Sequence, residues 1–337
     1  MTIRIYDSNI NFGSFALNMV SSGLYLTANA KFLVAGIEST SPLYGTSYGF
    51  ASGGAIFTPP FTNSNVIDRF PFATNANATD YGDLTVARMF DSGQSSTTHG
   101  YTSGGNLTPA PTRQNVIDKF PFASAANATD VGDLTSGKYG TAGQSSSTHG
   151  FVTGGYSPAA INNIDRFPFA TNANATDYGD LTLARTLLAG QSSTTYGYSS
   201  GGKAASLNTI DKFPFASAAN ATDVGDLTVG RYYVAGQSSV THGYTSGGSL
   251  GPSYSNVIDK FPFASDANAT DVGDLTATHY GTAGVSSSTN GYLVGLSQPP
   301  TTPTSIEKFP FATDTNASAV GNLSVSRGWI GDTAQQD

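Results

Sequence analysis

Short runs in which apolar and polar residues alternate, broken by glycine and turn residues, fill most of this chain. The run at 148–155 ends on two glycines, which permit positive φ and a sharp exit from a strand. No segment shows apolar residues spaced every three or four positions, so the pattern predicts strands and no long helix. Within one stretch we predict four strands, at 139–146, 148–155, 164–169 and 178–184.

Nearly the same amino-acid sequence recurs along the chain. The segment VIDKFPFASAANATDVGDL at 116–134 recurs at 257–275 with a single change, Ala125 to Asp266. An Ile-acid pair begins at Ile67, Ile117, Ile164, Ile210, Ile258 and Ile306, so the repeat is 46 to 50 residues long. Self-similarity at this period indicates a repeat architecture.

Four antiparallel strands in about 48 residues are typical of a propeller blade. One blade cannot bury both of its faces, so blades stack around an axis. We therefore predict an all-β chain, a single β-propeller of four-stranded blades. Repeated pairs such as Phe120 with Phe122 should fill the space between blades, and the Ala-, Gly- and Ser-rich first strands should crowd around the axis. Pro168 should end its strand, because proline cannot donate to a ladder.

The two ends of the chain suggest how the ring closes. Residues 328–334 match the first strand of a repeat and then stop. Residues 1–31 have no counterpart in the repeat and contain three candidate strands, at 3–6, 15–20 and 24–27. We predict one propeller domain over 1–337, with six repeats at 32–327 and a seventh blade built from 1–31 and 328–337. Six blades with ordered extensions is the alternative.

Composition narrows the class of protein. The net charge is −8 and no basic cluster is present, which argues against nucleic acid as a partner. Cysteine is absent, which excludes a disulfide framework and a thiolate metal site. No stretch approaches the ~18 apolar residues of a membrane span, so we expect no membrane insertion. The N-terminal residues lack the charged flank and apolar run of a signal peptide.

Gly-Tyr-Thr-Ser-Gly-Gly at 100–105 resembles the aromatic residue and glycine doublet of the kelch repeat. Phe120 stands where that family has a Tyr, Val131 where it has a Trp, and Lys138 or Arg185 where it has a closing Arg. The resemblance covers roughly residues 32–330 and implies a β-propeller, but it leaves function open because one fold hosts many functions. The repeated Asn-Ala-Thr-Asp and Phe-Pro-Phe segments also resemble the sequences of repeat proteins encoded by marine tailed phages.

The candidate chemistry-bearing residues are repeat features. His99, His149 and His242 recur at one strand position, which we interpret as a half-buried position rather than a metal ring. The two Asp of each Thr-Asp-x-Gly-Asp-Leu offer few oxygen ligands for Ca²⁺, so we expect them to bond turn amides or the repeat's Lys and Arg. No unique nucleophile or acid–base pair stands out, so we predict no enzyme activity, no metal and no cofactor.

Function is expected where the copies disagree. The loops between the glycine doublet and the Ile-acid pair differ in length and in sequence. Antiparallel strand order places these loops on one face of the ring. Apolar residues in a water-facing loop and a lone arginine are features of contact surfaces. The candidate binding residues are Phe57, Phe61, Arg113, Tyr156, Lys203 and Tyr254. Neutral spacing is the alternative interpretation of these loops.

We therefore expect a non-catalytic structural or binding propeller. The phage resemblance favours a virion component, such as a tail fibre, a capsid-decorating protein or a host-contact protein. Its partners would be other virion proteins or a host surface glycan. A carbohydrate-binding propeller lectin is the alternative, secreted or at the cell surface by a route without a signal peptide. A propeller enzyme resembling kelch-containing oxidases is a more distant alternative, disfavoured by the absence of cysteine.

Overall fold

The computed structural model describes residues 19–20, 23–24, 47–57, 61–108, 112–295, 304–330 and 335–336. It divides the chain into two units, Met1–Thr40 and Ser41–Asp337. In the first unit, β1 (Met19–Val20) and β2 (Gly23–Leu24) pair antiparallel. The candidate strand at 3–6 and most of those at 15–20 and 24–27 lie outside the described residues.

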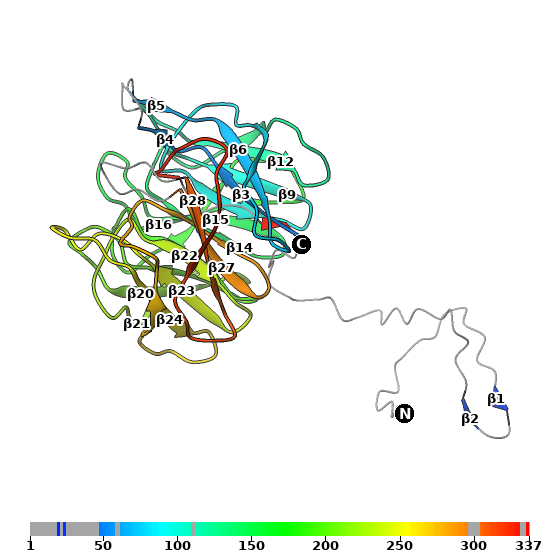
Figure 1. The fold of residues 1–337 in the computed structure, drawn as a ribbon. Helices are drawn as coiled ribbons and strands as arrows, with labels where there is room; N and C mark the ends of the chain where they lie inside the picture. Colours follow the sequence, from blue (N-terminus) through cyan, green and yellow to red (C-terminus); the bar gives the residue numbers. More distant parts are fainter. Residues whose placement is uncertain are drawn as a thin grey trace. The chain divides into compact units, whose positions relative to one another are not determined.

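The described part of the second unit is a β-propeller of six four-stranded antiparallel blades (Figure 1). The described residues contain no helix. We number the blades in the chain order of their second strands and give each from its innermost to its outermost strand.

Blade 1 contains β30 (Gln335–Gln336), β3 (Tyr48–Ser52), β6 (Val66–Pro71) and β7 (Thr79–Asp83). Blade 2 contains β8 (Ser92–Ser95), β9 (His99–Ser103), β12 (Val116–Pro121) and β13 (Thr129–Asp133). Blade 3 contains β14 (Ala142–Ser145), β15 (His149–Thr153), β16 (Asn163–Pro168) and β17 (Thr176–Asp180). Blade 4 contains β18 (Ala189–Ser192), β19 (Tyr196–Ser200), β20 (Thr209–Pro214) and β21 (Thr222–Asp226). Blade 5 contains β22 (Ala235–Ser238), β23 (His242–Ser246), β24 (Val257–Pro262) and β25 (Thr270–Asp274). Blade 6 contains β26 (Ala283–Ser286), β27 (Asn290–Val294), β28 (Ser305–Pro310) and β29 (Ser318–Asn322). Two loops add small hairpins, β4 (Ala55–Ile56) with β5 (Thr62–Asn63) and β10 (Asn106–Leu107) with β11 (Thr112–Arg113).

The ring has six blades in the described residues, the alternative expected from the sequence, and the prediction of seven is corrected. The C-terminal strand does close the ring, but it completes the first blade: in the pairing of β30 with β3, Gln335 lies opposite Gly49 and Gln336 opposite Tyr48. Each other blade takes its innermost strand from the linker that leaves the preceding blade. Because six blades bring the last linker beside blade 1, the C-terminus supplies that strand there.

In each blade, the third strand carries a register shift immediately after its isoleucine. In blade 2 the shift falls between Ile117 and Asp118, and these sequence neighbours are both fully buried. Ile117 packs in one cluster with Phe167 of blade 3, whereas Asp118 accepts hydrogen bonds from the linker that enters blade 2. In the Ile-acid pair, the isoleucine thus packs against the following blade, and the carboxylate bonds the linker that comes from the preceding blade.

The Phe-Pro-Phe segments fill the space between blades, as predicted. Phe120 and Phe122 of blade 2 pack on Phe50 of blade 1, with ring centroids 5.4 and 5.1 Å away. A Cβ on Gly150 would lie 2.4 Å from the ring of Phe167, so this strand position must be glycine. Pro168 is the last residue of β16, again as predicted.

A buried carboxylate joins each linker to the blade that follows it. Asp118 accepts hydrogen bonds from the Thr85 N–H at 3.0 Å and the Thr85 hydroxyl at 2.7 Å, and it pairs with Arg88 at 3.2 Å. Both charged side chains are fully buried. The arrangement recurs at Lys138–Asp165, Arg185–Asp211, Arg231–Asp259, His279–Glu307 and Arg327–Asp68. The last of these joins the end of the sixth repeat to blade 1, so it also closes the ring.

Two of the pairs depart from Arg–Asp, and each departure is compensated. Lys138 bonds Asn163 Oδ1 at 2.7 Å in addition to Asp165, and no other blade has Asn at that position. His279 is shorter than arginine, and its partner Glu307 is one methylene longer than aspartate. Burial pushes the pKa of Glu307 up, but the hydrogen bonds from His279 and Thr276 outweigh burial and hold that pKa below its usual value.

A second cation in the third strand of each blade is held in one of two ways. In one, a lysine bonds the loop of the next blade: Lys119 to Asn172, Lys212 to Asp266, Lys260 to Asp314 and Lys308 to Asn75. In the other, an arginine lies over a tyrosine of its own blade: Arg69 over Tyr81 at 4.7 Å and Arg166 over Tyr178 at 4.6 Å. After each arginine blade, the position of the Asn or Asp is alanine, Ala125 or Ala218.

This contact explains why the segments at 116–134 and 257–275 differ at one residue. Blade 2 follows the blade with Arg69, whose guanidinium is already held by Tyr81, and blade 2 has Ala125. Blade 5 follows the blade with Lys212, which needs an acceptor across the junction, and blade 5 has Asp266. The repeat is therefore altered where its neighbour requires it.

Small residues let the innermost strands crowd around the axis. A Cβ on Gly143 would lie 2.1 Å from the carbonyl oxygen of Gly93 in the neighbouring strand. The Ser95 N–H donates to Ser145 Oγ at 2.9 Å, which links the same two strands. Gln144 reaches further and donates to the Tyr198 carbonyl of the next blade at 2.9 Å. The small residues of the innermost strands thus reflect crowding around the axis, as predicted.

Glu307→Gln should lower stability at neutral pH and change its acid dependence. Glu307 accepts hydrogen bonds from the Thr276 N–H and hydroxyl and contacts His279 Nε2, and losing this buried acceptor costs about 1–3 kcal/mol. The pKa of Glu307 in the folded state lies below the unfolded value of about 4.3, so the advantage of the native residue is full above that pH and is lost as pH falls through the folded pKa. Urea unfolding from pH 7 to pH 3 should show the two stabilities converging at the acid end. A difference in stability that stays constant from pH 7 to pH 3 would contradict this account. The control is the double variant His279→Arg with Glu307→Asp, which restores the common pair and should keep native stability.

Converting one junction to the other version should be tolerated. Lys212→Arg, Val224→Tyr and Asp266→Ala together reproduce the junction of blades 1 and 2 between blades 4 and 5. We expect the triple variant to unfold within about 1 kcal/mol of the native protein, because exposed ion pairs contribute only about 0.2–1 kcal/mol. Thermal unfolding measures this, and a loss above about 2 kcal/mol would show that the two versions are not interchangeable.

Candidate binding face

The variable loops that the structure describes lie at one end of the propeller, where each second strand ends and each third strand begins. The first two contain the hairpins β4–β5 and β10–β11, and the next three close by single bridges, Tyr156–Ala160, Lys203–Ser206 and Ser249–Tyr254. We call this end the loop face. Most of the sixth loop lies outside the described residues.

Backbone hydrogen bonds close a ring at the centre of this face. One residue from each linker takes part: Phe90, Gly140, Leu187, Tyr233, Gly281 and Trp329, which we call the axial ring. Each N–H donates to the carbonyl of the preceding member, as Gly140 does to Phe90 at 2.8 Å and Leu187 to Gly140 at 2.6 Å. Phe90 donates to Trp329 at 2.9 Å, which completes the circle. The six linkers are thereby tied together just before the innermost strands begin.

All members of the axial ring have positive φ, between 52° and 64°. Glycine adopts this conformation readily, whereas a bulky residue there costs of order 1–3 kcal/mol and persists only where the surroundings enforce it. Four of the six positions nevertheless hold Phe, Leu, Tyr or Trp. The closed hydrogen-bond ring enforces the conformation, and strained backbone of this kind clusters at binding and active sites.

Aromatic side chains gather on the loop face. Setting aside the repeated core positions and the first position of the second strand, ten aromatic residues remain in the described residues, and all lie here: Phe57, Phe61, Phe90, Tyr139, Tyr156, Tyr232, Tyr233, Tyr254, Tyr280 and Trp329. Phe90 stacks on Trp329 with centroids 5.0 Å apart and lies 5.8 Å from Tyr233. An aromatic surface thus extends from the axis towards the loops.

The apolar and aromatic residues predicted from the sequence lie in this surface. Phe57 and Phe61 pack on Trp329, with centroid distances of 4.8 and 5.8 Å. Tyr254 stacks on Tyr280 at 4.3 Å with an interplanar angle of 11°. Phe61 and Tyr254 remain 40% and 39% exposed, so both offer ring surface to a partner. Their binding role stays a prediction.

The two predicted cations each lie over a tyrosine. Arg113 lies over Tyr156 at 5.5 Å, and Lys203 lies over Tyr232 at 5.1 Å. Such cation–π contacts are worth about 0.5–1 kcal/mol at exposed sites and fix the direction of the side chain. Arg113, Tyr156 and Lys203 are therefore brought into the same face as the predicted aromatic residues.

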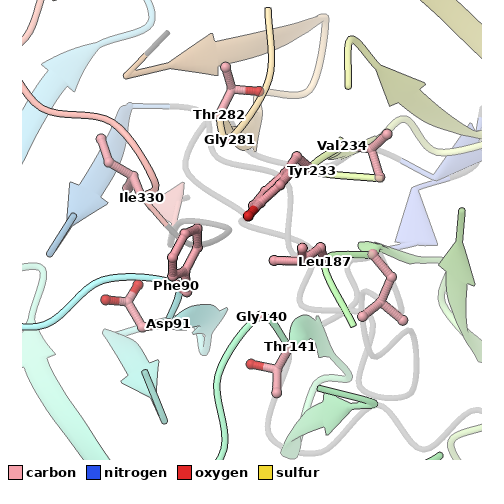
Figure 2. Close-up of a pocket in the computed structure, with 11 residues that line it drawn as sticks. Phe90, Asp91, Gly140, Thr141, Leu187, Tyr233, Val234, Gly281, Thr282 and Ile330 are labelled. Atoms are coloured by element: carbon pink, nitrogen blue, oxygen red, sulfur yellow. The ribbon is translucent and has the colours of Figure 1, made fainter. Parts of the chain in front are cut away.

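A pocket opens at the axis (Figure 2). Figure 2 shows Phe90, Leu187 and Tyr233 pointing towards its centre. Its empty space, the open mouth included, is about 350 Å³. Burial raises the pKa of Tyr233 to about 12, with the neighbouring tyrosines adding to the effect, so its hydroxyl is neutral at pH 7. The Thr141 hydroxyl, also in the lining, bonds Ser92 Oγ at 3.1 Å.

The repeated histidines lie at the opposite end of the blades. The His99 Nδ1 lies 2.8 Å from the Thr98 hydroxyl, and burial, followed by the charge of Lys119, lowers its pKa. His149 and His242 repeat this contact with their own threonines. Among the described residues, no group of three or more His, Cys, Asp or Glu is placed to hold a metal ion.

The aspartates of the Thr-Asp-x-Gly-Asp segment bond locally, as expected in part. Asp130 accepts the Gly132 N–H at 3.1 Å within its own turn. The partners of the buried Lys and Arg are instead the aspartates of the Ile-acid pair, such as Asp118. The first aspartates of the segment, such as Asp177 and Asp223, favour the charges of Lys138 and Arg185 from outside those ion pairs.

The sequence reasoning missed the axial ring. Two residues after the closing Arg, Lys or His, the copies read Phe, Gly, Leu, Tyr, Gly and Trp, which is a variable position inside a repeated segment. The criterion applied to the loops, that function lies where copies disagree, would have found it. The sequence alone does not show that these positions, 46 to 50 residues apart, meet at one axis.

No protein-family model matches this chain, and no curated protein matches its sequence. Within the described ranges, no helix has the length and apolar character needed to cross a membrane. The fold and the loop face therefore carry the functional argument.

Glycine substitutions should separate backbone strain from side-chain function in the axial ring. Leu187→Gly and Tyr233→Gly place at these positions the residue that blades 3 and 6 already use, so strain relief should offset the lost contacts and leave stability within about 1 kcal/mol. Gly281→Ala should destabilise, because its Cβ would lie 2.4 Å from the Trp329 ring in addition to the positive φ. Thermal unfolding of the three variants tests this order, and a stable Gly281→Ala protein would contradict it.

Proposed function

We propose that this protein is a non-catalytic binding propeller and a component of a phage virion, with the loop face as its docking surface. The gathering of the aromatic residues outside the core on the loop face carries the proposal. The similarity of the repeated sequence to repeat proteins of marine tailed phages supports the virion placement. In that setting the protein serves as a tail-fibre, capsid-decorating or host-contact protein.

The loop face suits contact more than chemistry. Its formal charges in the loops are Arg113 and Lys203, each held over a tyrosine ring. Arg, Tyr and Trp are the residues that dominate binding energies in protein interfaces. General acid–base catalysis often uses histidine, and the repeated histidines lie at the other end of the blades.

The scaffold lowers the cost of binding. Six blades joined by buried ion pairs and the axial hydrogen-bond ring hold the loops on a rigid base. Side chains and loops that are ordered before binding lose less conformational entropy when a partner arrives. A repeated, rigid blade with variable loops is therefore an economical way to present one surface.

A carbohydrate-binding propeller is the second candidate. The stacked pair Tyr254 and Tyr280 favours it, because one face of this flat platform is open to solvent through Tyr254. Binding of the purified protein to a glycan array, lost in Tyr254→Ser, would favour this candidate.

Replacing Phe57, Phe61 and Arg113 together by serine should abolish attachment to virions while the fold survives. The triple variant removes the aromatic contact with Trp329 and the charge over Tyr156, and we expect at least about a tenfold loss of attachment, as at interface hot spots. Cosedimentation with virions of the encoding phage measures attachment, and thermal unfolding checks the fold.

The matched control is Tyr196→His with Val240→Ser. Both are exposed at the opposite end of the blades, and each change installs a residue that other blades carry. Attachment should be unchanged in this control. A folded triple variant that still attaches to virions would show that the loop face is only spacing.

A further inference from the structure

We propose that the pocket at the axis is a socket for one apolar side chain of a protein partner, and that the surrounding loops form the rim of that contact. The proposal rests on the docking role proposed for the loop face. It narrows the partner to a protein with a projecting Leu, Ile, Met or Phe, and it excludes a sugar ring as the occupant of the axis.

The lining of the socket is mainly apolar where a ligand would enter, apart from the Tyr233 hydroxyl. Phe90, Leu187 and Tyr233 point to its centre, in front of the buried Val234 and Ile330. A sugar ring placed here would find the Tyr233 and Thr282 side-chain hydroxyls as partners, fewer than its own hydroxyl groups need, and burying the remaining hydroxyls without partners is costly. An aliphatic or aromatic side chain loses nothing of this kind and gains buried area.

Two polar residues of the lining, Thr141 and Asp91, are turned to the propeller itself, whereas the Tyr233 and Thr282 hydroxyls remain in the lining. The Thr141 hydroxyl bonds Ser92 Oγ, and Asp91 is 1% exposed and lies against Gly53, with its Oδ2 2.3 Å from where a Cβ on that glycine would be. Asp91 also acts on the buried Arg327, whose charge it favours. Thr141 therefore serves the junction of blades 2 and 3, and Asp91 serves the junction of blades 1 and 2.

The size and rigidity of the socket fit one side chain. Its space of about 350 Å³ includes open solvent at the mouth, so the enclosed part is smaller than the ~300–1,000 Å³ of small-molecule sites. The positive φ of Phe90, Leu187 and Tyr233, enforced by the backbone ring, fixes where these side chains begin. A site shaped before the partner arrives keeps more of the contact energy as affinity.

The rim has the composition of a protein contact. Half-buried aromatic residues surround a central apolar socket, and this is the arrangement of a hot spot with a rim that excludes water. Charge narrows the partner further: the chain carries −8, yet the variable loops carry only Arg113 and Lys203 and no acidic residue. The surface around the partner's apolar side chain should therefore be neutral or acidic, and not basic.

The experiment selects peptides from a displayed random library on the full-length protein and titrates the winners. Trp329 is the only tryptophan in the chain and stacks on the socket residue Phe90, so its fluorescence reports changes beside the socket. Leu187→Gly and Tyr233→Gly empty the socket while keeping a residue that the axial ring already uses. Tyr196→His, at the opposite end, is the control.

The expected result is a set of peptides that share one apolar residue and change Trp329 fluorescence on binding. Their affinity should fall at least about tenfold in Leu187→Gly and Tyr233→Gly, fall equally when the shared residue is changed to serine, and stay unchanged in Tyr196→His. Peptides without a shared apolar residue, or affinities that the glycine variants leave intact, would overturn the socket.

Two further measurements separate other occupants. Binding on a glycan array that the glycine variants abolish would place a sugar at the axis and overturn the proposal. Dimers in sedimentation analysis that these variants dissociate would make a second copy of this chain the occupant, which also overturns it. If the glycine variants attach to virions normally while the Phe57, Phe61 and Arg113 variant does not, the socket fails but the docking face stands.

Discussion

The buried pair of a linker cation and a third-strand acid is the contact on which the rest of the propeller depends. Two charges removed from water are costly, and a buried pair is tolerated only when its geometry is good and further hydrogen bonds satisfy it. Asp118 meets this condition with three partners, the Thr85 N–H, the Thr85 hydroxyl and Arg88. Because the partners come from the linker, the pair fixes where the chain lies as it passes from one blade to the next.

The position of the loop face follows from that constraint. Arg88 is two residues before Phe90, so the linker that is anchored through Arg88 delivers Phe90 to the axis, and the other linkers do the same for their own members of the axial ring. The strain of a positive φ at Phe90 or Tyr233 is small beside the cost of breaking a buried pair. The buried pairs at the junctions thus help to hold the positive-φ backbone of the axial ring at the centre of the candidate binding face.

The repeat is uniform except where a neighbour or a partner acts on it. Ala125 and Asp266 differ because the preceding blades hold their cation in different ways, by Tyr81 for Arg69 and across the junction for Lys212. Asn163 accompanies Lys138, and Glu307 accompanies His279, for the same kind of reason. Further variation falls in the loops and the axial ring, where no described junction requires it, and this is what gives the loop face its functional interest.

The sequence by itself determined the blade. Its four strands, the Phe-Pro-Phe filling and the small inner strands follow from local alternation, proline chemistry and side-chain size, which act over a few residues. It also placed Phe57, Phe61, Arg113, Tyr156, Lys203 and Tyr254 on one face, since antiparallel order puts alternate connections at the same end. Tertiary structure alone decided the number of blades, because the angle between neighbours sets when the last linker meets the first blade, and no local pattern encodes that angle. It alone brought Arg327 to Asp68, 259 residues away, and gathered Phe90, Tyr233 and Trp329 at the axis, because each is ordinary in its own repeat and becomes a site only when the ring is closed.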